Sequence, residues 1–309
     1  MSSNDHVPVL LGPVLQGLKI KPDGCYVDGT FGRGGHSREI LKQLGDDGRL
    51  IAIDRDPQAI ASAPVSLTGD PRFELVKGCC AQLEAIIGER GLVGNVDGLL
   101  FDLGVSSPQL DEAERGFSFM RDGPLDMRMD PESGEPASEW LATVGEQELK
   151  QVLRKFGEEN NAPRIARAIV HARNEAPISR TAQLARIVEE ACPRRGQKIH
   201  PATKTFQAIR IAINGELEQL EAVLSQSVRV MKKGARLCVI SFHSLEDRIV
   251  KRFMRDAARE PEQYRGMPVI PEAFLPKLRL VGKRIGANDE EIALNRRARS
   301  AHLRIAERT

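Results

Sequence analysis

Aromatic residues, cysteines and long apolar runs are all scarce in this chain of 309 residues, and each scarcity excludes a class of protein. Aromatic residues make up only 4% of the sequence, which argues against binding of single-stranded nucleic acid by repeated stacking of bases on rings. No apolar run approaches the roughly 20 residues that a membrane-spanning helix needs, and no basic-then-apolar signal peptide precedes His6. We therefore expect a soluble cytoplasmic protein that has no membrane partner.

The five cysteines and six histidines favour neither a disulfide framework nor a metal site. The cysteines are odd in number and show no C-x-x-C or zinc-finger spacing, as expected of reduced thiols in the cytoplasm. The histidines are scattered and form no H-x-x-x-H pair, so we predict no structural metal.

Net charge says little about the partner of the chain, but the distribution of charge says more. The formal net charge is only +2. Residues 192–210 nevertheless carry five Lys or Arg side chains and no acid, and residues 277–309 carry nine against four acids. Two basic regions on a nearly neutral chain fit a local contact with a polyanion, although either region alone is equally well interpreted as a solvated face.

A glycine-rich loop is the most informative feature that is present. Residues 27–36 read VDGTFGRGGH, so that a short apolar strand ends at Asp28, the loop follows, and an amphipathic helix begins after it. Glycine lets the backbone approach a ligand closely and adopt positive φ, and strand, glycine loop and helix together open the nucleotide pocket of an α/β sheet. The spacing G-x-x-G-x-G-G differs from the dinucleotide pattern G-x-G-x-x-G. It therefore favours another adenosine-type ligand over an NAD-dependent oxidoreductase.

Three acids follow predicted strands. Asp28 ends the first strand, Asp54 ends a strand over residues 48–53 and lies 19 residues after Gly35, and Asp102 lies in a strand over residues 96–103. Open α/β sheets bind ligands at the carboxyl ends of their strands, where an acid can bind a ribose diol. One such acid alone would be interpreted as a helix cap or a solvated loop residue. Three of them behind a glycine loop predict a pocket.

The alternation of strands and helices stops near residue 107 and resumes later in the chain. Residues 111–138 are rich in Gly, Pro and charge and predict a long irregular segment. Helices follow over residues 146–157, from residue 163, and over about 181–191, the first opened by a capping box from Thr143 to Glu146. Strands are then predicted over residues 236–242, 278–281 and 302–306. We therefore predict a split α/β domain of residues 1–108 and 216–309, interrupted by a helical insert of residues 109–215.

A Rossmann-like sheet with this loop and these acids suits S-adenosylmethionine. The loop would pass under the methionine and ribose, Asp54 would hold the ribose hydroxyls, and Asp102 would lie near the adenine or the methyl-transfer edge. The Ser107-Pro108 step is similar to the S/D-P-P-Y loop of enzymes that methylate exocyclic amines of bases. Taken alone, residues 106–109 would be an ordinary turn.

Seven segments spread from end to end resemble the bacterial 16S rRNA (cytosine-N4) methyltransferase family. The most specific is GFSFMRDGPLDMRMD at residues 116–130. The resemblance implies a class I methyltransferase domain interrupted by a helical domain, which methylates N4 of a cytosine in the decoding region of small-subunit rRNA with S-adenosylmethionine. The seven segments are residues 6–11, 28–36, 102–109, 116–130, 200–216, 241–248 and 295–304.

The resemblance also implies roles for individual residues. The cofactor contacts are Gly34, Gly35 and His36 beside Gly32 in the loop, then Asp54, Cys80, Asp102 and Gln109. Asp102, Ser107 and Pro108 shape the transfer site, and His243 is as well explained by a structural hydrogen bond as by a role in the site. Arg194, Arg195, Lys198 and Lys204 are predicted to bind rRNA phosphates. The chain departs from the family pattern at Cys80, where an aromatic residue is usual, and at Lys204, where we expect arginine.

Two alternatives stay open from the sequence. One is a non-catalytic RNA-binding protein of ribosome assembly that keeps the methyltransferase fold, for which Cys80 is the only support. The other is the NAD-dependent oxidoreductase, which the glycine spacing disfavours.

Overall fold

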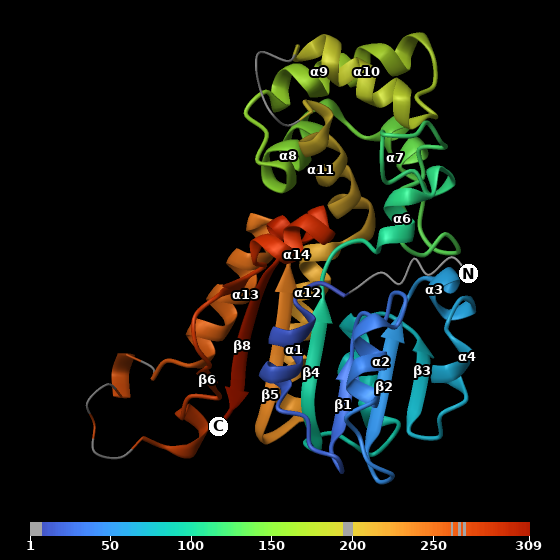
Figure 1. Cartoon of the computed structure of the whole chain (residues 1–309). Coiled ribbons are helices and arrows are strands. Elements are labelled where there is room, and N and C mark those ends of the chain that lie inside the picture. The colour runs from blue at the N-terminus through green and yellow to red at the C-terminus, as the bar shows by residue number, and fades with distance from the viewer. Residues whose placement is uncertain (1–7, 194–199, 261, 265–266, 268–269) are drawn as a thin grey trace. The chain divides into compact units, whose positions relative to one another are not determined.

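The computed structural model describes the chain except residues 1–7, 194–199, 261, 265–266 and 268–269 (Figure 1). The chain divides into two compact units, which we call unit 1 (Met1–Gly104 with Leu217–Thr309) and unit 2 (Val105–Glu216). The chain passes from one unit to the other after Gly104 and after Glu216. The predicted domain boundaries fall after residues 108 and 215. Among the described residues, no helix combines the length and the apolar character needed to cross a membrane.

Unit 1 is built on a sheet in the order β3-β2-β1-β4-β5-β8-β6, with the short β7 paired to β8. The first five strands in this order run parallel, and β8 runs antiparallel to β5. The predicted Rossmann-like α/β fold with a helical insert is confirmed. The strands are β1 (Cys25–Asp28), β2 (Arg49–Asp54), β3 (Phe73–Lys77), β4 (Val96–Asp102), β5 (Met231–Ser241), β6 (Leu278–Leu280), β7 (Ile285–Gly286) and β8 (His302–Arg308).

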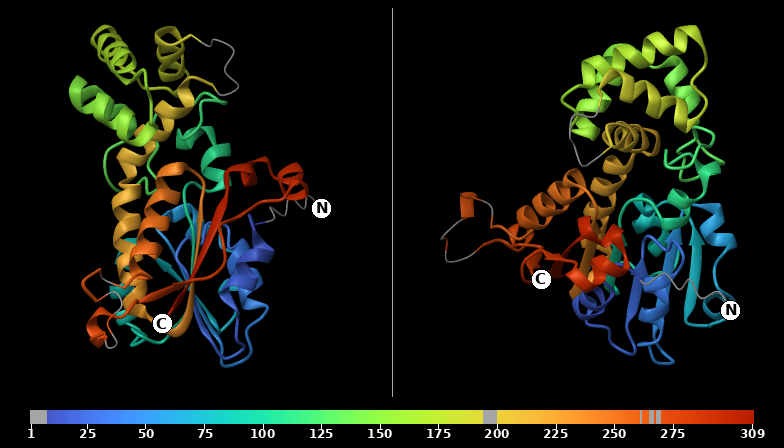
Figure 2. Two further views of the ribbon diagram at one scale, coloured as in Figure 1. Left: turned by 90° about the vertical axis from the view of Figure 1, so that its left-hand side faces the viewer. Right: turned by 45° about the horizontal axis from the view of Figure 1, so that its top comes forward.

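Helices bury both faces of this sheet, as the left panel of Figure 2 shows. Along β4, Leu99 and Phe101 join one apolar cluster, whereas Leu100 between them joins the other. A parallel strand that is buried on both faces reads as a continuous apolar run, which explains the sequence of this strand. The helices of unit 1 are α1 (Leu11–Leu18), α2 (Gly35–Leu41), α3 (Pro57–Ala61), α4 (Val65–Thr68), α5 (Leu83–Gly88), α12 (Glu216–Val230), α13 (Ser244–Ala257) and α14 (Asp289–Leu294), with 3₁₀ turns η1 (Cys80–Gln82), η3 (Glu262–Tyr264), η4 (Glu272–Phe274) and η5 (Arg296–Ser300).

Unit 2 is helical, as predicted, and among its described residues only an isolated bridge between Pro124 and Arg180 has strand pairing. Helix α8 packs against both α9 and α11, and α9 packs against α10. Gly157, at the end of α8, permits this packing, because a Cβ there would lie 2.7 Å from the carbonyl oxygen of Lys204. The helices are α6 (Ser107–Asp111), α7 (Ala137–Thr143), α8 (Glu146–Gly157), α9 (Ala162–Glu175), α10 (Thr181–Ala191) and α11 (Ala202–Asn214), with the 3₁₀ turn η2 (Ala113–Arg115).

One local prediction in unit 2 is wrong. Thr143 does not cap α8: it is the last residue of α7, where its hydroxyl lies 3.3 Å from the carbonyl oxygen of Trp140, and Gly145 precedes α8 without a side-chain cap. Residues 106–109 are not an ordinary turn but the start of α6. Proline is favoured in the first turn of a helix, where its missing N–H costs nothing, so the Ser-Pro step fits a helix start as well as a turn.

Candidate functional site

The three acids behind the glycine loop lie at one edge of the sheet in unit 1. Strand β1 lies between β2 and β4, and Asp28 pairs in register with Ala52 and Leu100. Asp54 and Asp102 therefore each lie two residues further along their strands than Asp28 does. Strands β2 and β4 thus extend two residues beyond β1 on either side of it. The loop of residues 29–34 begins at the end of β1, between them.

Asp28 anchors this loop rather than facing a ligand. The side chain is buried, with 1% exposed, and one oxygen accepts a hydrogen bond from Ser37 Oγ at 2.7 Å. The other accepts one from the Thr30 N–H at 3.2 Å. Burial raises the pKa of Asp28, and these hydrogen bonds oppose the rise.

The glycines of the loop have two different tasks. Gly34 has φ +70°, and a Cβ there would lie 2.7 Å from Leu67 Cδ1 and from the Phe31 ring. A Cβ on Gly35 would lie 2.6 Å from Pro8. Both glycines are thus required by packing within the protein. Gly32, at φ +56°, has only the Thr30 carbonyl within 4 Å of its Cβ position, so it is the loop glycine that leaves open space.

Asp54 is held by backbone donors on both oxygens. Oδ2 accepts from the Gly32 N–H at 2.7 Å and Oδ1 from the Asp56 N–H at 2.9 Å. Each carboxylate oxygen has two lone pairs, so each can accept a further hydrogen bond from a ligand hydroxyl. Burial raises the pKa of Asp54, and the two backbone hydrogen bonds oppose this.

Asp102 has a buried oxygen that lacks a partner among the described residues. Its Oδ1 atom makes no hydrogen bond there, although the side chain as a whole is 27% exposed. Burial raises the pKa of Asp102 to about 6, with the charge of His36 acting in the opposite direction. A buried acceptor without a donor is unfavourable, so this atom fits a hydrogen bond from a ligand.

His36 connects Asp102 to the N-terminal segment. The imidazole is buried, with Nε2 3.0 Å from the Val9 carbonyl oxygen and Nδ1 3.7 Å from Asp102 Oδ2. Because a carbonyl only accepts, Nε2 must carry the hydrogen. Nδ1 is then the ring nitrogen that faces the Asp102 carboxyl, at a distance longer than a hydrogen bond. The structure thus gives His36 a positioning task, and the cofactor contact implied by the resemblance stays a prediction.

Adjacent cysteines lie at the end of β3. The Cys79 thiol donates to Gln219 Oε1 at 3.3 Å, and Arg55 Nη1 donates to the same oxygen at 2.9 Å. The hydrogen bond from Cys80, the Ala81 N–H and the charge of Arg55 lower the pKa of Cys79 to about 6 against the effect of burial. The pKa of Cys80 is raised by its hydrogen bond to Cys79 and by burial, and Cys80 packs against the apolar cluster of α5 and α12.

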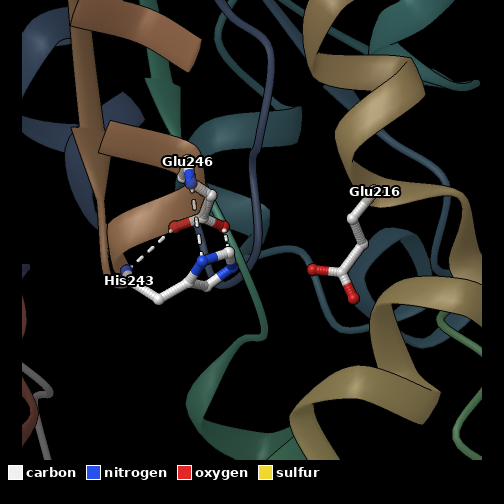
Figure 3. Close-up of side chains that lie close together, drawn as sticks. All are labelled: Glu216, His243 and Glu246. Atoms are coloured by element: carbon white, nitrogen blue, oxygen red, sulfur yellow. Dashed lines mark hydrogen bonds and ion pairs between the residues drawn. The ribbon is translucent and has the colours of Figure 1, made fainter. Parts of the chain in front are cut away.

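His243 caps helix α13 (Figure 3). Its Nδ1 accepts from the Glu246 N–H at 3.5 Å, and Glu246 Oε2 accepts in return from the Phe242 and His243 N–H groups at 2.8 and 3.3 Å. The structure thus provides the structural hydrogen bond that was one of two expectations for His243. Glu246, which is 2% exposed, was missed by the sequence reasoning. The spacing His-x-x-Glu ahead of an amphipathic run is a capping-box signal that could have identified it. Glu216, also labelled in Figure 3, is the last residue of unit 2 although it begins α12, and it pairs with Arg210 at 2.7 Å.

Other predicted site residues lie in unit 2. Ser107 and Pro108 are the first two residues of α6, and the buried Gln109 accepts from the Ser106 N–H through Oε1 at 2.9 Å. Lys204 Nζ donates to the Glu158 carbonyl oxygen at 3.0 Å, at the end of α8. Arg194, Arg195 and Lys198 lie outside the described residues.

The residues of the unit 1 edge fit an adenosyl ligand. The spare acceptor positions of Asp54, the unpartnered Oδ1 of Asp102 and the open space at Gly32 suit a ligand that carries hydroxyl and amino donors. The glycine spacing and these acceptors do not distinguish between adenosyl ligands by themselves.

Comparison with solved structures finds several of low similarity. A candidate rRNA methylase from Clostridium thermocellum is 14% identical, with 98% of this chain and 100% of that chain covered and a TM-score of 0.46. An S-adenosylmethionine-dependent methyltransferase from Aquifex aeolicus is 11% identical, covering 97% and 90%, with a TM-score of 0.42. An rRNA methylase from Streptococcus thermophilus is 11% identical, covering 96% and 93%, with a TM-score of 0.38.

The MraW methylase family matches residues 3–309, nearly the whole chain. This match excludes the NAD-dependent oxidoreductase and confirms the resemblance to the 16S rRNA (cytosine-N4) methyltransferases. The chain therefore belongs to the MraW methylase family, and it is a methyltransferase that depends on S-adenosylmethionine.

Proposed function

We propose that this chain transfers a methyl group from S-adenosylmethionine to N4 of a cytosine in the decoding region of 16S rRNA, acting on the small ribosomal subunit in the cytoplasm. The observation that carries the proposal is the edge of unit 1, where Asp54 and the unpartnered Oδ1 of Asp102 offer hydrogen-bond acceptors beside the open space at Gly32. The resemblance of the family motifs implies which nucleobase is methylated and that the substrate is rRNA.

Asp54 and Gly32 would hold the ribose of the cofactor. When bound, S-adenosylmethionine supplies a methyl group activated by its sulfonium charge. Asp54 is fixed by the N–H groups of Gly32 and Asp56, so its remaining lone pairs have a set direction before the ligand arrives. Preorganised acceptors of this kind reduce the ordering that binding requires.

Asp102, Ser107 and Pro108 would shape the transfer site. The exocyclic amine of cytosine is a weak nucleophile because its lone pair is delocalised into the ring. Acceptors that hydrogen-bond its N–H groups would favour the tetrahedral geometry in which the lone pair becomes available. The His36 imidazole lies beside Asp102, with Nδ1 3.7 Å from Oδ2. A base that is paired at N4 has to leave its stack before it can react.

Substitution of Asp54 tests the cofactor site. We expect Asp54→Ala to weaken S-adenosylmethionine binding by at least about tenfold, because a charge-assisted hydrogen bond contributes roughly 1.5–3 kcal/mol. Isothermal titration calorimetry measures the dissociation constant, and a thermal melt of each variant verifies folding. Asp47→Ala, on an exposed loop at the opposite edge of the sheet, is the matched control. Equal affinity of the two variants would remove Asp54 from the site.

The product is tested on rRNA itself. We expect 16S rRNA from cells that lack the gene to be without one N4-methyl group on a cytosine in the decoding region, and the purified protein with S-adenosylmethionine to restore it. Mass spectrometry of nuclease fragments locates the methyl group. The alternative, a non-catalytic RNA-binding protein of ribosome assembly, is favoured only by Cys80 in a position where the family has an aromatic ring. An unchanged methylation pattern in those cells would support that alternative.

A further inference from the structure

The segment that precedes β8 lies at the same edge of unit 1 as the candidate site. Strand β8 is antiparallel to β5, and its first residue, His302, pairs with Ser241, the last residue of β5. Gly286 of β7 also pairs with His302. Figure 1 shows α14 beyond the arrowhead of β5. Residues 283–300 are therefore gathered where the parallel strands end.

Four basic side chains of this segment are exposed and have no ion-pair partner among the described residues. They are Lys283, Arg284, Arg296 and Arg299, which we call the edge patch. No carboxylate in the described part of the chain lies within ion-pair distance of any of them. Arg304, by contrast, binds both oxygens of Asp247 at 2.8 and 3.0 Å, and Arg279 pairs with Glu307. Arg284 is the exception, because its charge helps to lower the pKa of Asp247. Lys283, Arg296 and Arg299 thus keep their charge available for a partner.

The acids of the segment are gathered at the start of α14. Asp289, Glu290 and Glu291 all lie in the first turn of α14, where negative charge stabilises a helix start. Glu291 is also occupied, since its Oε1 accepts from the Leu10 N–H at 2.5 Å.

Buried residues and a helix cap hold the backbone around the edge patch in place. Ala298 and Ala301 are buried at 0% and 1% exposure, and Asn295 accepts from the Arg297 N–H at 3.0 Å to cap η5. A short series of contacts then leads to the site: Glu291 binds Leu10, and the neighbouring Val9 carbonyl binds His36 beside Asp102. The edge patch is therefore anchored to the same N-terminal segment that binds His36 beside Asp102.

One apolar side chain accompanies these charges. Leu294, at the end of α14, is 87% exposed and lies two residues before Arg296. A single exposed leucine is common on protein surfaces and needs no explanation by itself. Some nucleic-acid-binding proteins combine Arg or Lys contacts with an apolar side chain, leucine included, that is inserted between base steps, and Leu294 beside these charges fits the same use.

We propose that the edge patch binds backbone phosphates of the RNA strand that carries the target base, with Leu294 packed against an unpaired base of that strand. The identity of the RNA rests on the proposed function, whereas the charges and their placement do not. The patch would hold the strand at the edge where Asp54 and Asp102 lie.

The salt dependence of RNA binding tests the phosphate contacts. Removal of one phosphate-binding cation should flatten the slope of log K against log salt by roughly 0.7–0.9, so Arg296→Ala with Arg299→Ala should flatten it by about 1.4–1.8. Filter binding of a 16S rRNA transcript from about 50 to about 200 mM salt measures this slope. The control is Lys233→Ala with Arg259→Ala, which removes the same charge from exposed positions near the opposite edge and should leave the slope unchanged. Lys283→Ala with Arg284→Ala provides a second, independent pair.

The leucine contact has a different signature. Leu294→Ala should weaken RNA binding severalfold at constant slope, since no charge is removed, whereas Val93→Ala, exposed at the opposite edge, should change neither quantity. Cofactor affinity, measured without RNA, should stay at the wild-type value in every one of these variants. If the salt slope stays at the wild-type value in both double variants, the Arg296/Arg299 pair and the Lys283/Arg284 pair, the inference is overturned and the proposed function still stands. Failure of the wild-type protein to bind or methylate 16S rRNA would instead overturn the proposed function.

Discussion

At the scale of single residues, Asp102 links the candidate site to pH. Its pKa is raised to about 6 from an ordinary value of 3.8, because burial disfavours the carboxylate. The folded protein therefore holds this proton over a pH range in which the unfolded chain releases it. The stability that protonation provides is fully present below about pH 4 and is lost as the pH rises through about 6.

Asp102→Asn should remove this dependence. Because asparagine stays neutral, we expect the variant to be more stable than the wild type at pH 8, by at most roughly 3 kcal/mol. The difference should shrink to near zero at pH 4. Thermal unfolding without cofactor, followed at several pH values, measures it, and Asp47→Asn on an exposed loop serves as control. A stability difference that does not vary with pH would contradict the assignment.

Cys79 should be the reactive thiol of the chain. Its pKa is lowered to about 6, and the thiolate is the nucleophilic form. We expect alkylation by iodoacetamide to rise through about pH 6 at Cys79, and Arg55→Ala to move that midpoint to higher pH. Cys25 and Cys238, whose pKa values burial raises to about 11 and 12, are internal controls in the same peptide map. Equal reactivity of all three thiols at pH 7 would disprove this.

Several contacts of the site could not be predicted from the sequence, for a physical reason. The carbonyl that fixes His36 belongs to Val9, 27 residues earlier, and the carboxylate that binds Leu10 belongs to Glu291, 281 residues later. Such pairs depend on the finished fold and leave no local pattern. The positions of Asp54 and Asp102 at strand ends were predictable, because each lies at the end of an apolar strand.

At the scale of elements, the loop between β1 and α2 depends on Gly34. Its φ of +70° disfavours any side chain, and a Cβ would also meet Leu67 and Phe31 at 2.7 Å. We expect Gly34→Ala to lower the free energy of unfolding by roughly 3 kcal/mol, from backbone strain and overpacking together. Gly94→Ala separates the two effects, because φ is +78° there and nothing lies within 4 Å. It should cost only about 1 kcal/mol. Urea denaturation compares them, and equal losses of stability would show that the contacts at Gly34 are unimportant.

Elements with a clear period were predicted well, whereas the two-residue β7 was not predicted. Helix α10 was predicted over the residues it occupies, because its apolar positions recur at helical spacing. Strand β7 has two residues, too few to show alternation, and its pairing with β8 is purely tertiary. The capping box at Thr143 failed because the preceding helix α7 runs through that residue.

At the scale of the whole molecule, unit 1 contains its own core. Both of its apolar clusters consist of residues before Gly104 or after Glu216. We therefore expect a variant in which a Gly/Ser linker replaces residues 105–216 to stay folded and to unfold cooperatively. Far-UV circular dichroism during heating measures this, with the full chain as control. A broad, non-cooperative transition would show that unit 2 is needed for folding of unit 1.

The pairing of β4 with β5 joins distant parts of the chain, since Asp102 lies opposite Ile240, 138 residues later. The entropic cost of closing a loop grows only with the logarithm of its length, so doubling the intervening chain adds roughly 0.6 kcal/mol. The connection between β4 and β5 can therefore hold inserted domains of very different size. The same catalytic sheet could thus be retargeted to new substrates by exchanging what is spliced in after β4.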